Sequence, residues 1–277
     1  MTGNKAQIEY WNGPTGEKWA RHNSETDRGL AEAANAVLKL AGARSGERVL
    51  DIGCGAGITS FSLAELVGPS GHVTGVDVSQ PLLALARSRT SATNIDFIEA
   101  DAALYPFKSD YDLIFSRFGV MFFVDPVAAF RNIRNAAVPG GRLAFICWRT
   151  TQENEWVSLS YAAAKPFLPE RKPVHPHAPG PFAFADADRL QGVLRDAGFS
   201  EIGIAPFDGM MDLGSAPQNA SFQVTQLMGP VSRALQGADD ATRTKVEDVV
   251  AEALASIQTG AENIRLGMAC WLVSAKV

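Results

Sequence analysis

Cysteine and long hydrophobic runs are scarce in this chain of 277 residues, and each scarcity argues against a class of protein. The three cysteines are odd in number and far apart, which argues against a disulfide framework and is typical of a reducing compartment. No uninterrupted apolar stretch approaches the ~18 residues that a membrane span needs. The first residues lead into no apolar segment of the kind that secretory signals have. We therefore expect a cytoplasmic protein without a membrane span.

An excess of positive charge is also lacking, which argues against nucleic acid as a partner. Lysine and arginine number 25 against 30 aspartate and glutamate residues, so the formal net charge is −5. One feature opposes this interpretation, a set of arginines in the middle of the chain: Arg117, Arg131, Arg134, Arg142 and Arg149. Hydrophobic residues make up 46% and charged residues 20%, as in a globular protein with a sizeable core. The length permits one large domain or two small ones.

Strand and helix patterns alternate between residues 48 and 148. A regular alternation of this kind predicts a parallel, doubly wound α/β sheet. The predicted strands are Arg48–Ile52, His72–Val76, Ile95–Glu99, Tyr111–Ser116 and Arg142–Trp148. The predicted helices between them are Ile58–Val67, one capped by Ser79, and one opened by Asp125 and Pro126.

The flanking parts of the chain have different patterns. Residues 1–46 are predicted to be mostly helical, with a helix over 30–40 that ends at Gly42. The proline-rich stretch 165–185 is predicted to be a long ordered loop, followed by a helix that Asp186 caps. Phe199–Pro206 and Leu266–Ala275 are predicted strands, and residues 208–265 between them are predicted to be mostly helical. A helical insertion before the last strand is a candidate lid or cap.

The segment Val49-Leu50-Asp51-Ile52-Gly53-Cys54-Gly55-Ala56-Gly57 combines a strand, a glycine-rich turn and the start of a helix. Glycines let a backbone approach a ligand closely. A dinucleotide fingerprint would need glycine at positions 53, 55 and 58, but position 58 is isoleucine. The carboxylate of Asp51 beside the turn would repel a pyrophosphate and would suit an ammonium or sulfonium group. The pattern therefore favours S-adenosylmethionine over NAD.

Two more acidic residues follow the next two predicted strands. Asp77 comes 20 residues after Gly57 and is placed to accept both hydroxyl groups of an adenosine ribose. Asp101 and Ala102 follow the third strand, where a carboxylate and a backbone amide can meet the edge of an adenine. A single acid after a strand is usually a helix cap. Three such acids beside a glycine turn favour one nucleoside-binding crevice.

These segments closely resemble the class I S-adenosylmethionine-dependent methyltransferases, in particular the branch similar to enzymes of ubiquinone and menaquinone biosynthesis. The resemblance covers about residues 45–150. Its further matching segments are Gly75-Val76-Asp77-Val78-Ser79, Glu99 to Phe107, Tyr111 to Ser116 and Val138 to Leu143. It implies a Rossmann-like sheet of seven strands with an antiparallel last strand, S-adenosylmethionine as methyl donor and S-adenosylhomocysteine as product.

The resemblance also implies roles for single residues. The three turn glycines would lie along the methionine portion of the cofactor, with Asp51 near its amino group. Asp77 would bind the ribose, and Asp101 and Ala102 would bind the adenine. The predicted cofactor-binding residues are Asp51, Gly53, Cys54, Gly55, Gly57, Asp77, Val78, Asp101, Ala102, Ser116, Arg117 and Trp19.

The sequence identifies the methyl acceptor less closely than it identifies the cofactor. Where methyltransferases of nucleobase amino groups have Asn/Asp-Pro-Pro-Tyr, this chain has Ser116-Arg117-Phe118-Gly119, which counts against a DNA adenine or protein glutamine. A small-molecule acceptor is favoured, and an RNA or protein methyltransferase and a non-catalytic cofactor-binding module are the alternatives. Whether oxygen, nitrogen or carbon is methylated stays open, as does the choice between monomer and homodimer.

A catalytic base is not evident from the sequence. The candidates are His22, His175, His177 and Tyr10. His175 and His177 lack neighbouring cysteines or carboxylates, so no metal site is expected. The predicted division of the chain is a helical lid segment (1–44) that includes Trp11 and Trp19, a cofactor-binding core (45–150), and a part (151–277) that completes the sheet and carries a cap at about 208–265.

Overall fold

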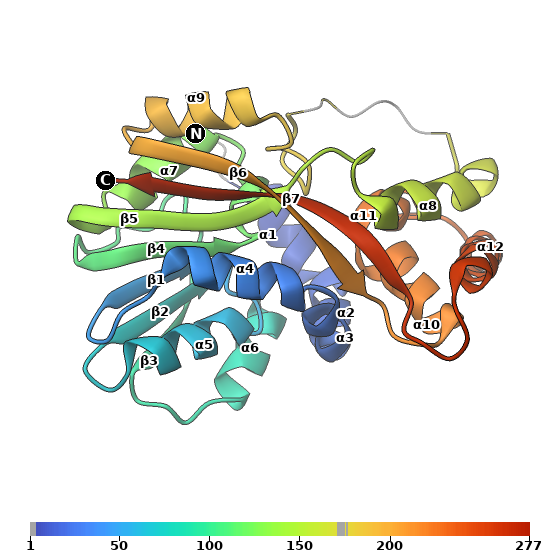
Figure 1. Ribbon diagram of the computed structural model, residues 1–277, viewed down its shortest axis with the longest axis horizontal. Coiled ribbons are helices and arrows are strands. Elements are labelled where there is room, and N and C mark those ends of the chain that lie inside the picture. The colour runs from blue at the N-terminus through green and yellow to red at the C-terminus, as the bar shows by residue number, and fades with distance from the viewer. Residues whose placement is uncertain (1–3, 171–174, 176) are drawn as a thin grey trace.

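A single seven-stranded sheet forms the centre of the protein in the computed structural model, which describes residues 4–170, 175 and 177–277 (Figure 1). The strand order is β3-β2-β1-β4-β5-β7-β6. β7 pairs antiparallel with both β5 and β6, whereas the pairings among β1 to β5 are parallel. The strands are β1 (Arg48–Ile52), β2 (His72–Asp77), β3 (Ile95–Glu99), β4 (Tyr111–Arg117), β5 (Ala137–Trp148), β6 (Ser200–Asp212) and β7 (Arg265–Lys276). The predicted fold class, with its antiparallel last strand, is confirmed.

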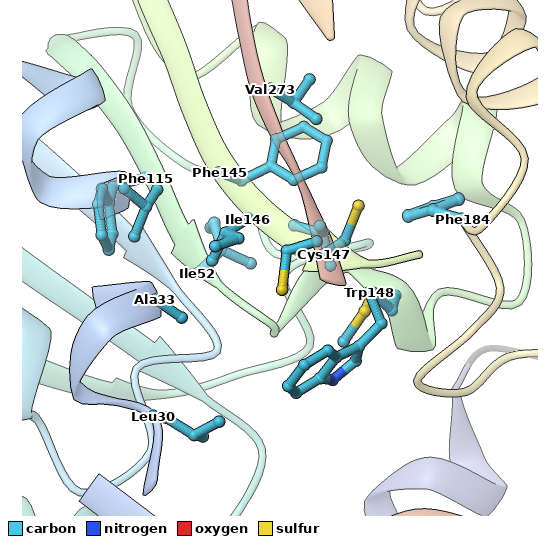
Figure 2. Packing of buried hydrophobic residues seen from close by; sticks show 14 of the residues in the cluster. Leu30, Ala33, Ile52, Phe115, Phe145, Ile146, Cys147, Trp148, Phe184 and Val273 are labelled. Atoms are coloured by element: carbon cyan, nitrogen blue, oxygen red, sulfur yellow. The ribbon is translucent and has the colours of Figure 1, made fainter. Parts of the chain in front are cut away.

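The central strands form because they are nearly continuous apolar runs, as expected where helices cover both faces of a parallel sheet. Four of the five residues of β1 are buried, and so are most residues of β4. Phe115 and Phe145 are completely buried on neighbouring strands, and Val273 pairs with Phe145 across from β7 (Figure 2). The core therefore fixes the carboxyl ends of β1, β2 and β4 in one place.

Helices lie on both faces of the sheet (Figure 1). On one face are α4 (Ala31–Ala41), α5 (Ile58–Val67) and α6 (Gln80–Ser88); on the other are α7 (Pro126–Arg134) and α9 (Ala187–Asp196). The predicted ends hold: α4 stops at Gly42, whose φ is +52°, and the Asp186 carboxylate accepts the Arg189 N–H at the start of α9.

Two further groups of helices lie at the carboxyl ends of the strands. The N-terminal group is α1 (Lys5–Asn12), α2 (Pro14–Arg21) and α3 (Asn23–Gly29). The second group, here called the cap, is α8 (Glu155–Ala164), α10 (Pro217–Phe222), the π-helix η3 (Gln223–Leu227), α11 (Gly229–Ala234) and α12 (Asp240–Ile257). β6 and β7 stay paired beyond the end of β5 and lead into the cap (Figure 1). Short 3₁₀ turns are η1 (Val120–Phe122) and η2 (Lys165–Phe167).

Several predicted boundaries are wrong. Residues 208–212 were predicted as helix but are the end of β6, because they pair with Arg265–Ala269 of β7. β5 begins at Ala137 rather than Arg142, and α8 lies in a stretch for which no helix was predicted. Ser79 precedes α6 as expected, but its hydroxyl donates to the Trp11 carbonyl instead of capping the helix.

Part of the proline-rich stretch predicted as a loop, residues 171–174 and 176, lies outside the described residues. Among the residues that are described, we find no helix with the length and apolar character needed to cross a bilayer.

Candidate active site

A cavity of about 200 Å³ opens at the carboxyl ends of β1, β2 and β4. The residues that line it come from the N-terminal helices, the strand ends, the segment after β4, the cap and the loop at Pro181. Of the predicted cofactor-binding residues, the structure brings nine to its wall: Gly53, Cys54, Gly55, Asp77, Val78, Asp101, Ala102, Arg117 and Trp19. Asp51, Gly57 and Ser116 lie behind the wall.

The glycine turn is held tightly against the next strand. The N–H groups of Gly53 and Cys54 both donate to the Val76 carbonyl, at 2.8 and 3.1 Å. Gly53 has a φ of +69°, and a Cβ there would lie 2.6 Å from the Cα of Gly119. Only glycine fits such a position, so the turn backbone itself forms the cavity wall. Burial raises the pKa of the Cys54 thiol, which keeps it neutral in this wall.

Asp77 is fixed by backbone donors on both carboxylate oxygens. The Gly55 N–H donates to Oδ2 at 2.8 Å, and the Ser79 N–H donates to Oδ1 at 2.9 Å. Burial raises the pKa of Asp77, and these backbone hydrogen bonds lower it. Each oxygen has more than one acceptor direction, so the carboxylate can accept further hydrogen bonds from the cavity.

Asp101 has one oxygen in use and one free. Its Oδ1 accepts from the Asn4 side-chain amide at 2.9 Å and from the Ala103 N–H at 3.0 Å. Its Oδ2 is buried and has no hydrogen-bond partner among the described residues. Asn4 is itself anchored, because its Oδ1 accepts the Val124 N–H at 3.0 Å. A buried acceptor without a partner on a cavity wall fits a donor that a ligand would supply.

Asp51 supports the turn from behind and is completely buried. The hydroxyl groups of Thr59 and Ser60 donate to its Oδ2 at 2.9 and 2.6 Å, which ties β1 to α5. Its Oδ1 has no partner among the described residues. Burial raises the pKa of Asp51 to about 6, although the two hydroxyl donors and Arg117 oppose this shift.

Gly57 and Ser116 also act behind the wall. A Cβ at Gly57 would lie 2.8 Å from the Phe61 ring, so this glycine permits close packing of α5. The Ser116 hydroxyl donates to the Ile52 carbonyl at 2.7 Å and accepts the Gly119 N–H at 3.1 Å. This brace joins the ends of β1 and β4.

Two consecutive side chains at the end of β4 reach the cavity. Phe118 has a φ of +60° and stacks on Trp148, with ring centroids 4.4 Å apart. Arg117 places its Nη2 3.3 Å from Oδ1 of Asp27 in α3, while its Nη1 is buried without a partner among the described residues. Burial raises the pKa of Asp27, and the guanidinium groups of Arg117 and Arg89 lower it.

The N-terminal helices close one side of the cavity. Trp11 makes edge-to-face contacts with Trp19 and Phe122, at centroid distances of 5.5 and 5.7 Å. The Trp19 indole N–H donates to the Leu227 carbonyl of the cap at 2.9 Å. The N-terminal segment therefore contacts both the core and the cap.

The four candidate bases are not brought together. Tyr10 lines the cavity, but His22, His175 and His177 do not. His22 contacts Glu25 and the Phe222 ring, and the other two histidines are exposed and lie beside each other. In the part of the chain that the structure describes, no group of three or more His, Cys, Asp or Glu side chains could hold a metal ion.

The sequence patterns predicted a cap but not which of its residues reach the cavity. Leu227, Met228, Gly229, Ser232 and Arg233 line the cavity from η3 and α11. Trp156 also lines it, although an aromatic residue of this kind is more often core. The Gly229-Pro230 step, which interrupts the helices here, was the one available signal; the φ of Gly229 is +81° and the Trp156 ring packs against it.

Comparisons with known proteins match the chain to a methyltransferase family model and to a methyltransferase. A family model described as "Methyltransferase domain" matches residues 43–167. Demethylmenaquinone methyltransferase from Staphylococcus aureus is 27% identical over 185 residues, which cover 62% of this chain and 76% of that protein.

Two solved structures share the fold. YcgJ of Bacillus subtilis has a TM-score of 0.57 at 16% identity and covers 89% of this chain and 98% of that one. Phosphoethanolamine N-methyltransferase 2 of Haemonchus contortus, in complex with S-adenosyl-L-methionine, has a TM-score of 0.53 at 17% identity and covers 88% of this chain. This chain spans about half the length of that enzyme, 52%.

Proposed function

Because the chain is a class I S-adenosylmethionine-dependent methyltransferase, we propose that it transfers the methyl group to a small organic molecule. The observation that carries this proposal is the cavity, which continues from the glycine turn into an aromatic space between the N-terminal helices and the cap. Enclosed spaces with apolar walls and a few polar groups are typical of sites for small molecules. The S. aureus relative is named for a small-molecule substrate.

The polar groups at one end of the cavity fit the cofactor. Asp77 is the proposed acceptor for the ribose hydroxyl groups, because its carboxylate is fixed beside the turn and faces the cavity. Asp101, with its unpartnered Oδ2, and Ala102 are the proposed adenine contacts. Gly53, Cys54, Gly55 and Val78 would flank the cofactor, while Asp51, Gly57 and Ser116 would hold those segments in place. Trp19 and Arg117, which the sequence patterns also assign to the cofactor, line other parts of the wall.

When bound, S-adenosylmethionine supplies a methyl group on a sulfonium that is already activated for in-line displacement. The residues of the chain then need to align the acceptor and exclude water. Trp11, Trp19 and Phe122 form an edge-to-face cluster on one side of the cavity, and Phe118 and Trp148 form a stacked pair in its wall. We propose that residues 1–44 act as the lid and that the cap selects the acceptor.

The alternative of an RNA or protein acceptor rests on the arginines between 117 and 149. Four of them are engaged elsewhere in the fold: Arg131 and Arg134 donate to carbonyls at the end of α9, Arg142 pairs with Glu47, and Arg149 pairs with Glu153 and Asp208. Of the set, Arg117 is the member that lines the cavity. These contacts favour a structural role for most of the set.

The proposal is tested by incubating the purified protein with S-adenosylmethionine carrying a labelled methyl group. Three acceptor pools are compared: cellular metabolites, RNA and protein. We expect label in a metabolite, and the Asp77→Ala variant should lose this labelling. Label in RNA or protein would overturn the proposal, and binding of the cofactor without any transfer would favour a non-catalytic module.

A further inference from the structure

The charged side chains of the cavity are separated by sign. Among the described residues, the carboxylates on the wall are Asp77 and Asp101, both at the end proposed for the nucleoside. The cations on the wall are Arg117, at the end of β4, and Arg233, in the cap helix α11. The space left for the acceptor therefore has positive groups on two sides.

Arg117 shares its counter-ions with other groups. Its one ion pair among the described residues is with Asp27, whose Oδ2 also lies 3.9 Å from Nη1 of Arg89, and its charge also acts on the buried Asp51. Two guanidinium groups thus share one carboxylate, and Nη1 of Arg117 stays buried without a partner among the described residues. A buried N–H of a cation costs free energy unless an acceptor meets it.

Arg233 is half-buried and forms no salt bridge with a carboxylate of the described residues. Its guanidinium lies 6.0 Å from the centroid of the Tyr10 ring. A Cβ at Gly180 would come within 2.7 Å of its Nη1, so the absence of a side chain there leaves room for the guanidinium. The group is positioned by neutral neighbours, which leaves its charge available to a ligand.

We propose that the methyl acceptor is an organic anion whose carboxylate or ionised phenol oxygen is bound by Arg117 and Arg233. This inference rests on the proposed function and defines its substrate class. Guanidinium groups match such oxygens with paired, charge-assisted hydrogen bonds. The aromatic wall of Phe118, Trp148 and Trp156 would hold the apolar body of the molecule.

The pairing of the two wall arginines supports an anion over a neutral or cationic acceptor. The charge of Arg117 interacts with Asp27 and with the buried Asp51. Arg233 has no carboxylate partner among the described residues, so an anionic group of the acceptor would balance it. Even if one arginine met the carboxylate of the cofactor, the other would remain for the acceptor. An acceptor oxygen that arrives ionised also has no proton to lose.

Binding calorimetry in the presence of saturating S-adenosylhomocysteine tests the proposal. The probes are 2-naphthoate and its neutral analogue 2-naphthamide; 4-nitrophenolate and neutral 4-nitroanisole test the phenol case. We expect at least one anion to bind about tenfold or more tightly than its neutral analogue, which corresponds to about 1.4 kcal/mol. Arg233→Gln should remove this preference and leave the affinity for S-adenosylhomocysteine unchanged.

Arg117→Gln should also reduce the preference for the anion. If this variant is poorly folded, Arg117→Lys, which keeps the positive charge, should retain part of the preference. Arg195→Gln, at an exposed arginine of α9, is the matched control and should behave as the unchanged protein. If Arg117→Gln weakens S-adenosylhomocysteine binding but keeps the anion preference, then Arg117 pairs with the cofactor and its assignment to the acceptor is wrong.

Equal affinity for anions and neutral analogues, or no binding of either anion, would overturn the proposal. Such a result with intact S-adenosylhomocysteine binding would leave the proposed function standing. If the protein without substitutions did not bind S-adenosylhomocysteine, that result would instead contradict the proposed function itself.

Discussion

At the scale of single residues, Asp77 is the side chain on which cofactor affinity should depend most. Asp77→Ala removes the proposed acceptor of two hydroxyl groups, and hydrogen bonds to a charged group contribute ~1.5–3 kcal/mol each. We expect at least a roughly tenfold weaker affinity for S-adenosylhomocysteine in calorimetry. Asp96→Ala, at an exposed aspartate of β3, is the control. Unchanged binding by Asp77→Ala would mean that Asp77 only holds the glycine turn.

Asp51 predicts a pH dependence of stability. Burial raises its pKa from 3.8 to about 6, so the folded state holds the proton more tightly than the unfolded chain. Between about pH 4 and pH 6 the unfolded state has lost this proton and the folded state has not. The Asp51 contribution to the free energy of unfolding therefore falls as pH rises through this window, by roughly 3 kcal/mol in total.

The Asp51→Asn variant tests this dependence because an amide does not titrate here and its oxygen can still accept from Thr59 and Ser60. Urea unfolding of both proteins at several pH values gives the difference in their free energies of unfolding. We expect this difference to change with pH between about 4 and 6 and to be constant above about 7. A difference that is the same at every pH would show that the carboxyl group is not perturbed.

At the scale of elements, we expect the N-terminal helices to behave as one unit, which Asn12 connects to the core by hydrogen bonds. The Asn12 amide donates to the Val78 carbonyl at 2.7 Å and its oxygen accepts the Gln80 N–H at 2.9 Å, directly after Asp77. Asn12→Ala removes both bonds, which contribute ~0.5–1.5 kcal/mol each. We expect faster hydrogen exchange in α1 and α2 and a cofactor affinity weaker by several-fold.

Asn35→Ala, at an exposed position of α4, is the matched control for this variant and should change neither quantity. If exchange in α1 and α2 stays slow in Asn12→Ala, then the aromatic contacts of Trp11 hold the segment without these hydrogen bonds.

The elements of the core were predictable from local pattern, and those of the flanks were less so. β1, α5 and β3 have the predicted ends because apolar runs, glycines and caps define them locally. β6 was predicted too short because its residues 208–212 are mostly partly exposed and include Gly209, so local pattern does not indicate a strand. They are extended because β7, more than fifty residues later, pairs with them.

At the scale of the whole molecule, the same contrast applies to the site. The glycine turn, Asp77 and Asp101 were predictable because carboxyl ends of neighbouring parallel strands meet at one edge of a sheet. The contact between Trp19 and Leu227 joins residues 208 positions apart, and no local pattern specifies such a pairing. The end of the cavity proposed for the cofactor could thus be predicted from the sequence, whereas the place of Arg233 of the cap in the cavity wall could not.

Because the cavity is built from the N-terminal helices, the sheet and the cap, a ligand in it should stabilise the molecule as one unit. A ligand at a hundred times its Kd adds about 2.7 kcal/mol to the free energy of unfolding. For a chain of this size, we expect S-adenosylhomocysteine to raise the midpoint of thermal unfolding by about 5–10 °C. NAD at the same concentration should have no effect, because the glycine spacing does not fit it. Calorimetric scans should show one transition that shifts as a whole. A separate early transition that the ligand leaves in place would mean that the cap or the N-terminal helices unfold independently and do not close over the cofactor.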